Sequence, residues 1–151
     1  MAKRTANHQY NGGKQYFDGE VQTSGDVYVD GALNSSGRIT EKLTVTNVDA
    51  RHNTLSAAQI KAGIVVHTSV TGAGNVTLDT AANIISGVPL DADDETVKVY
   101  YVNDGNRTLT LVAASGTTIA DTGNTILEDE AMVLLVRRTS STAVTVYPAT
   151  S

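Results

Sequence analysis

Short apolar runs separated by turn residues recur through most of the chain after residue 55, and they constrain the fold more than any other feature. Gly, Asn, Asp or Ser bounds most of these runs. Many short strands with turn signals between them are typical of an all-β protein built as an antiparallel β-sandwich. The expected strands cover about 63–69, 75–78, 96–102, 107–113, 117–120, 124–127, 131–138 and 142–147, close to the eight strands of a jelly roll.

Two short helices are expected among these strands. Ser56 is a suitable N-cap for a helical turn that Gly63 ends. Asp79 is expected to cap a second helix that ends near Gly87, with Pro89 beyond its end.

Composition divides the chain of 151 residues into three parts. Residues 1–19 are polar and slightly basic, and they are expected to form an extended arm. Residues 20–54 are expected to form a small β extension, and residues 55–151 the jelly-roll domain. Because the chain has one Phe and no Trp, the core of this domain must come from aliphatic side chains.

The arm has two interpretations. It is a frayed terminus, or it becomes ordered on a partner through its aromatic side chains. We favour the second, because aromatic residues gather here, outside the expected core, in a chain with six Tyr and one Phe. The basic and aromatic residues of the arm are Lys3, Arg4, Tyr10, Lys14, Tyr16 and Phe17.

The 20–54 segment alternates apolar and polar residues with period two. This pattern predicts a β-hairpin or one turn of a β-solenoid, which is too small to bury its apolar face alone. The segment must therefore pack on the main domain or around a symmetry axis with copies of itself. The expected inner face consists of Val27, Val29, Leu33, Ile39, Leu43 and Val45.

Two expected strands, 97–102 and 132–136, carry apolar residues on both faces. A sandwich strand normally exposes one polar face. A second cover is therefore expected, and two candidates stay open: another subunit, or a loop or the 20–54 segment of the same chain.

The residues offer no recognisable catalytic or metal site, so neither an enzyme nor a cofactor is expected. The chain has no Cys, which excludes disulfides and thiolate metal ligands. His8, His52 and His67 do not have metal-ligand spacing, and His67 is expected to be a strand residue with a satisfied ring. The glycines of 72–74 are interpreted as a hairpin turn rather than a phosphate loop.

Charged residues concentrate in turns. Carboxylates at the density of 91–95 can bind Ca²⁺, but this stretch lacks the Gly and distal Glu of an EF-hand, and we favour a solvated loop. Residues 128–130 are expected to form a charged hairpin turn. One of Arg137 and Arg138 is expected to point outward. The net charge of −5 argues against a nucleic-acid partner, and no stretch approaches the ~20 apolar residues of a membrane span.

In this order, residues 55–68, 76–84, 99–111, 114–119 and 136–139 resemble the jelly-roll domain of capsid decoration, or cement, proteins of tailed bacteriophages. The resemblance covers residues 55–148. It implies a homotrimer on the outer capsid surface of the virion, assembled in the host cytoplasm. The major capsid protein would be the partner. Residues 1–19 would reach the capsid, and no catalytic residue carries over.

Two other functions are weighed against this one. The chain could be the receptor- or glycan-binding head of a viral fibre, because the same sandwich serves in lectins; the expected loops hold few of the aromatics that carbohydrate sites use. A polysaccharide-degrading enzyme would need two carboxylates facing each other across a cleft, whereas the acids here fall mainly in turns.

Overall fold

The computed structural model describes residues 10–11, 14–15, 43–68, 72–120 and 123–150. The chain divides into two compact units, Met1–Thr40 and Glu41–Ser151. In the first unit, β1 (Tyr10–Asn11) and β2 (Lys14–Gln15) pair antiparallel.

The second unit contains two short helices and the remaining strands. The helices are α1 (Ala57–Ala62) and α2 (Ala81–Gly87). The strands are β3 (Thr44–Val48), β4 (Asn53–Leu55), β5 (Gly63–His67), β6 (Gly74–Leu78), β7 (Thr96–Asn103), β8 (Leu109–Val112), β9 (Thr117–Ile119), β10 (Thr125–Ile126), β11 (Glu130–Ser140) and β12 (Ala143–Thr150). Each of the eight strands expected after residue 55 has a counterpart here, from β5 to β12.

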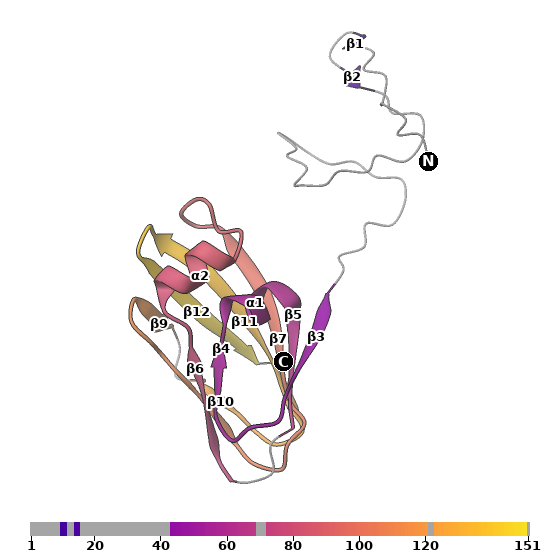
Figure 1. Cartoon of the computed structure of the whole chain (residues 1–151), viewed down its shortest axis with the longest axis vertical. Coiled ribbons are helices and arrows are strands. Elements are labelled where there is room, and N and C mark those ends of the chain that lie inside the picture. Colours follow the sequence, from indigo (N-terminus) through magenta and orange to yellow (C-terminus); the bar gives the residue numbers. More distant parts are fainter. Residues whose placement is uncertain (1–9, 12–13, 16–42, 69–71, 121–122, 151) are drawn as a thin grey trace. The chain divides into compact units, whose positions relative to one another are not determined.

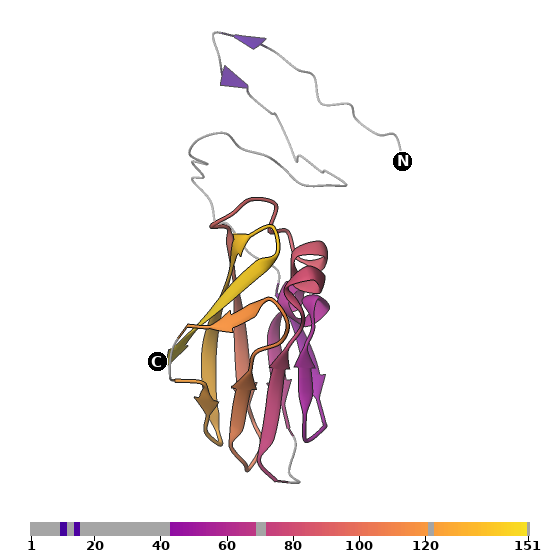
Figure 2. The ribbon, with the colours of Figure 1, turned by 90° about the vertical axis from the view of Figure 1, so that its left-hand side faces the viewer.

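The strands form two sheets. The six-stranded sheet has the order β3-β5-β7-β11-β12-β9, and the four-stranded sheet has the order β10-β8-β6-β4. Figures 1 and 2 show the strands running alongside one another, with α1 and α2 next to each other toward one end. The inner faces of the two sheets share one hydrophobic core, to which both helices contribute.

The expected antiparallel jelly roll is wrong. Both sheets are mixed, because β3, β5 and β7 run parallel in one sheet and β4, β6 and β8 run parallel in the other. Strand β9 also pairs parallel with β12. Antiparallel pairing is confined to β10 with β8 and to β11 with both β7 and β12 among the described strands of this unit.

The parallel strands arise because the chain winds in successive coils. From β3 it crosses to β4 in the other sheet, passes through α1, and returns to the first sheet as β5. It then repeats this path through β6, α2 and β7, and crosses again to β8. Parallel neighbours need such crossover connections, and here the helices form part of them.

Several turns expected to close hairpins instead join the two sheets. Gly72 lies between β5 and β6, and Gly74 begins β6; residues 128–129 lie between β10 and β11, and Glu130 begins β11, so in both places the chain changes sheet. The alternation of apolar residues indicates which face of a strand is buried, but it does not indicate in which sheet the next strand pairs.

The helix ends follow local capping rules. Ser56 caps α1 as predicted, in a capping box with Gln59, and Gly63 ends the helix in the left-handed conformation with φ of 87°. For α2 the predicted cap is wrong by one residue. The cap is Thr80, whose Oγ1 accepts a hydrogen bond from the Asn83 amide, while Asp79 binds the Thr80 amide at 2.8 Å.

Strand β3 and the first two residues of β4 fall within the range assigned above to the 20–54 extension, whose residues 20–42 lie outside the described residues. They are nevertheless part of the sheets of the second unit, because β3 pairs with β5 and β4 pairs with β6. Val48 and Leu55 of these strands are buried in the shared core.

Candidate assembly surface

The outer face of the six-stranded sheet is apolar over its centre. The registers of neighbouring strands place side chains in rows that cross the sheet. The first row consists of Val45, Ile64, Tyr100, Val133 and Ala149. A second row consists of Asn47, Val66, Val102 and Ala131, and a third of Lys98, Leu135 and Tyr147.

These outer side chains are partly open to solvent. Val45 is 52% exposed and Leu135 is 37% exposed. Tyr100, Val102 and Val133 are half-buried. Contiguous apolar surface of this kind marks interaction sites in soluble proteins.

The outer face of the four-stranded sheet has the opposite chemistry. Its rows consist of Thr54, Thr77 and Val112, and of Asn75, Thr110 and Thr125. Hydroxyl and amide side chains therefore cover most of this face, as expected for a sheet that faces water.

The two apolar strands noted in the sequence thus belong to a larger surface. The sequence identified the apolar outer residues of β7 and β11, but it missed their neighbours on β3, β5 and β12. A signal was present in β5, where Ile64, Val65 and Val66 make the strand apolar on both faces.

Charges lie at the margin of this face and are bound within the chain. Arg137 pairs with Asp94 and donates a hydrogen bond to the Tyr147 hydroxyl at 3.1 Å. The hydrogen bond to Asp94 is the main reason that the pKa of Arg137 is raised. The Lys98 ammonium lies 5.0 Å from the centre of the Tyr100 ring.

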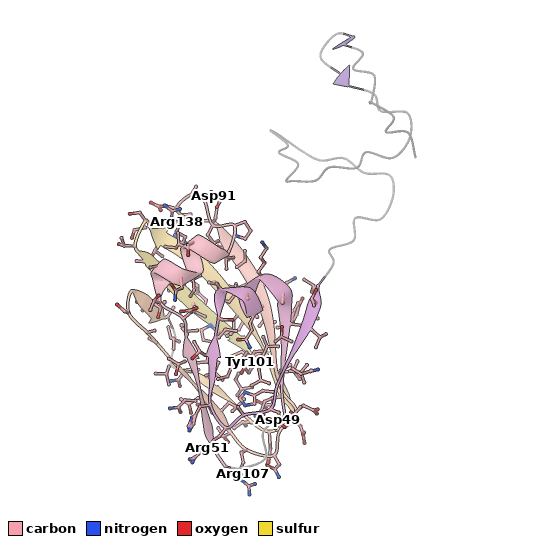
Figure 3. All side chains as sticks on the ribbon, in the orientation of Figure 1. Asp49, Arg51, Asp91, Tyr101, Arg107 and Arg138 are labelled. Atoms are coloured by element: carbon pink, nitrogen blue, oxygen red, sulfur yellow. The ribbon has the colours of Figure 1, made fainter. Side chains whose placement is uncertain are left out.

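The neighbouring Arg138 binds the carboxylate-rich loop of residues 91–95 and the end of the segment before it. Its Nη1 donates to the carbonyls of Leu90 and Asp91 at 2.8 and 2.7 Å, and its Nε lies 3.1 Å from Asp93. Arg138 and Asp91 lie together near the helix-bearing end (Figure 3). One of the two arginines was predicted to point outward, and the more exposed one is Arg137, with 39% of its side chain open against 16% for Arg138.

A buried polar cluster is centred on His67 and Tyr101. His67 and Tyr101 are fully buried, and the His67 Nδ1 lies 2.8 Å from the Tyr101 hydroxyl. The His67 Nε2 contacts the Ala50 carbonyl, so both ring nitrogens have partners, as predicted. Asn53 donates to the same Tyr101 hydroxyl at 3.2 Å. Burial raises the pKa of Tyr101 to about 12.

The predicted capsid-binding residues lie mostly outside the described residues. This applies to Lys3, Arg4, Tyr16 and Phe17. Tyr10 and Lys14 lie on β1 and β2, where Tyr10 is paired with Gln15 and Lys14 with Asn11.

Within the described ranges, no three His, Cys, Asp or Glu side chains form a group that could hold a metal ion. In the same part of the chain, neither helix has the length and apolarity needed to cross a bilayer. No protein-family model matches the chain, and neither the curated proteins nor the solved structures give a match.

Proposed function

We propose that the chain is a non-enzymatic structural protein of a tailed-phage virion. It acts as a homotrimeric decoration protein on the outer capsid surface, where it bridges major capsid subunits. The observation that carries this proposal is the apolar outer face of the six-stranded sheet, which a protein working alone in water would not need.

Because the parallel strands rule out a jelly roll, topology does not support this function. The support comes from the apolar sheet face and from the arm of residues 1–19, whose basic and aromatic residues suit a partner surface. The interior cluster contributes no exposed reactive group, because His67 and Tyr101 are fully buried and bonded to each other.

The mechanism is a linkage effect. A protein that binds the assembled shell and not its free subunits shifts the equilibrium toward the shell. A trimer carries three arms, so each arm after the first binds at a high effective concentration. Weak contacts of single arms are thereby converted into stable decoration.

The test begins with the purified particles of the virus that encodes the chain. Quantitative mass spectrometry should find the chain in numbers comparable to the major capsid protein, and immunogold labelling should place it on the outside of the head. Its absence from particles, or its location at the tips of fibres, would contradict the proposal.

A truncation tests the role of the arm. Deleting residues 1–19 should leave an oligomer with unchanged circular dichroism that no longer cosediments with heads lacking their decoration protein. Full occupancy of these heads by the truncated protein would refute the role of the arm.

A further inference from the structure

We propose that the outer face of the six-stranded sheet is the surface through which copies of this chain associate. Its occupant is therefore a second copy of the same chain. This inference rests on the trimer of the proposed function and deepens it, because it assigns the contact between copies to one face.

The outer faces of the two sheets differ in chemistry. Both faces belong to the same unit, yet the outer face of the four-stranded sheet presents mainly threonine and asparagine, with Val112, whereas that of the six-stranded sheet presents mainly valine, isoleucine, leucine and tyrosine, with Asn47 and Lys98. Leaving the second set in water costs about 25 cal/mol for each Å² of apolar area. A partner that covers only the outer face of the six-stranded sheet accounts for the difference in chemistry between the two faces.

The distribution of charge also favours contact between copies on this face. The first two rows contain no charged residue, and Arg137 at the margin is paired with Asp94. Copies of a chain with net charge −5 repel one another at long range. A neutral, apolar face is the surface on which they can meet without burying unpaired charge.

The N-terminal segment leads into the edge of the same sheet. Forty-two residues precede Leu43, and they join the described sheet at β3, its edge strand and the site of the exposed Val45. Of the apolar residues expected on the inner face of the 20–54 segment, Val27, Val29, Leu33 and Ile39 precede β3, and a short hairpin cannot bury them alone. Copies that meet beside β3 bring their N-terminal segments to a common place, which suits the shared packing expected from the sequence.

The same surface could also accept a chain of different sequence. That partner would be recognised through charges or hydrogen bonds specific to it, because electrostatic complementarity gives specificity more than affinity. The central rows carry none of these groups apart from the Asn47 amide and the Tyr100 hydroxyl, so they favour self-association.

Single cysteine probes test this surface in the full chain, which has no native cysteine. Val133 and Thr110 are a matched pair, since both are half-buried outer residues on strands of opposite sheets. The Val133→Cys variant should react with a small maleimide about tenfold more slowly than Thr110→Cys when nine-tenths of the chains are associated. Dilution should remove this difference.

A second pair of variants tests the same claim by mass. Val133→Asp places a charge in the centre of the face and should reduce the light-scattering mass from that of three chains to that of one, with unchanged circular dichroism. Thr110→Asp is the control and should stay trimeric. Equal labelling of the two cysteine variants, or an intact trimer for a folded Val133→Asp variant, would overturn the inference.

These results are distinguishable from a failure of the proposed function. A trimer that dissociates on Val133→Asp but is absent from virus particles contradicts only the virion role. A trimer that decorates heads but whose Val133→Cys variant is labelled freely contradicts only the assignment of the face, whereas a chain that decorates heads as a monomer contradicts both the face and the trimer of the proposed function.

Discussion

The His67 imidazole and the Tyr101 hydroxyl form a 2.8 Å hydrogen bond between parallel strands β5 and β7, and both side chains are fully buried. The Ala50 carbonyl can only accept, so the His67 Nε2 carries a proton and donates to it. In the neutral ring the Nδ1 then accepts from the Tyr101 hydroxyl, whose oxygen also accepts from Asn53. These hydrogen bonds connect β4, β5 and β7, which belong to three successive passages of the chain between the two sheets.

Removing the Tyr101 hydroxyl should therefore destabilise the unit. In Tyr101→Phe, the His67 Nδ1 and one Asn53 donor lose a buried partner, which costs about 1–3 kcal/mol of unfolding free energy. Urea denaturation measures this change. Tyr100→Phe is the control on the outer face and should alter stability by less than about 0.5 kcal/mol. Equal effects of the two variants would show that the buried cluster contributes nothing special.

The raised pKa of Tyr101 predicts a loss of stability in alkali. Its pKa rises from 10.0 in the unfolded chain to about 12 in the folded one, because burial disfavours the phenolate. The folded state therefore holds the proton more tightly, and this contribution is fully present below pH 10 and is lost as the pH rises toward 12. The loss should reach about 3 kcal/mol.

Other groups also titrate in this range, so the measurement compares variants. Unfolding free energies at about pH 9 and about pH 11 should fall more steeply for the parent chain than for Tyr101→Phe. Parallel pH profiles for the two proteins would contradict the assignment of this loss to Tyr101.

Arg138 is expected to hold the loop that precedes β7. Arg138→Lys keeps the charge but loses the guanidinium geometry in which Nη1 binds the Leu90 and Asp91 carbonyls while Nε lies beside Asp93. Stability should fall by about 1–3 kcal/mol, and hydrogen exchange should accelerate in residues 91–95. Asp93→Asn removes only the exposed ion pair and should cost less than about 1 kcal/mol. A larger effect of Asp93→Asn would reverse the ranking of these contacts.

Gly63 is needed where α1 ends and β5 begins. Its φ of 87° disfavours any side chain, and a Cβ there would lie 2.7 Å from the Leu43 Cδ2. Gly63→Ala should therefore lower the unfolding free energy by more than about 1 kcal/mol. Gly123→Ala meets no heavy atom within 4 Å and should be close to neutral. A Gly63→Ala variant as stable as the parent would refute this reading of the turn.

The sequence located the strands of the second unit well, because their side chains obey the inside–outside alternation of a half-buried sheet. It could not give their direction. Parallel pairing of β5 with β7 depends on where the chain crosses between sheets, and residues 68–73 look the same whether they close a hairpin or change sheet.

The candidate surface was predictable in part. The apolar outer residues Tyr100, Val102 and Val133 were visible in the sequence as strands without a polar face. Their assembly into rows with Val45 and Ile64 depends on the parallel registers of β3, β5 and β7, which only the structure provides. The cap of α2 was missed because Asp79 and Thr80 are adjacent, and both are good capping residues.

The central claim is that the outer face of the six-stranded sheet is built to be covered by further copies of the chain. Native mass spectrometry of the full chain tests it most directly. We predict a species of three times the 15.8 kDa chain mass that persists at low micromolar concentration. A single-chain mass at every concentration, including the highest that stays soluble, would contradict the claim.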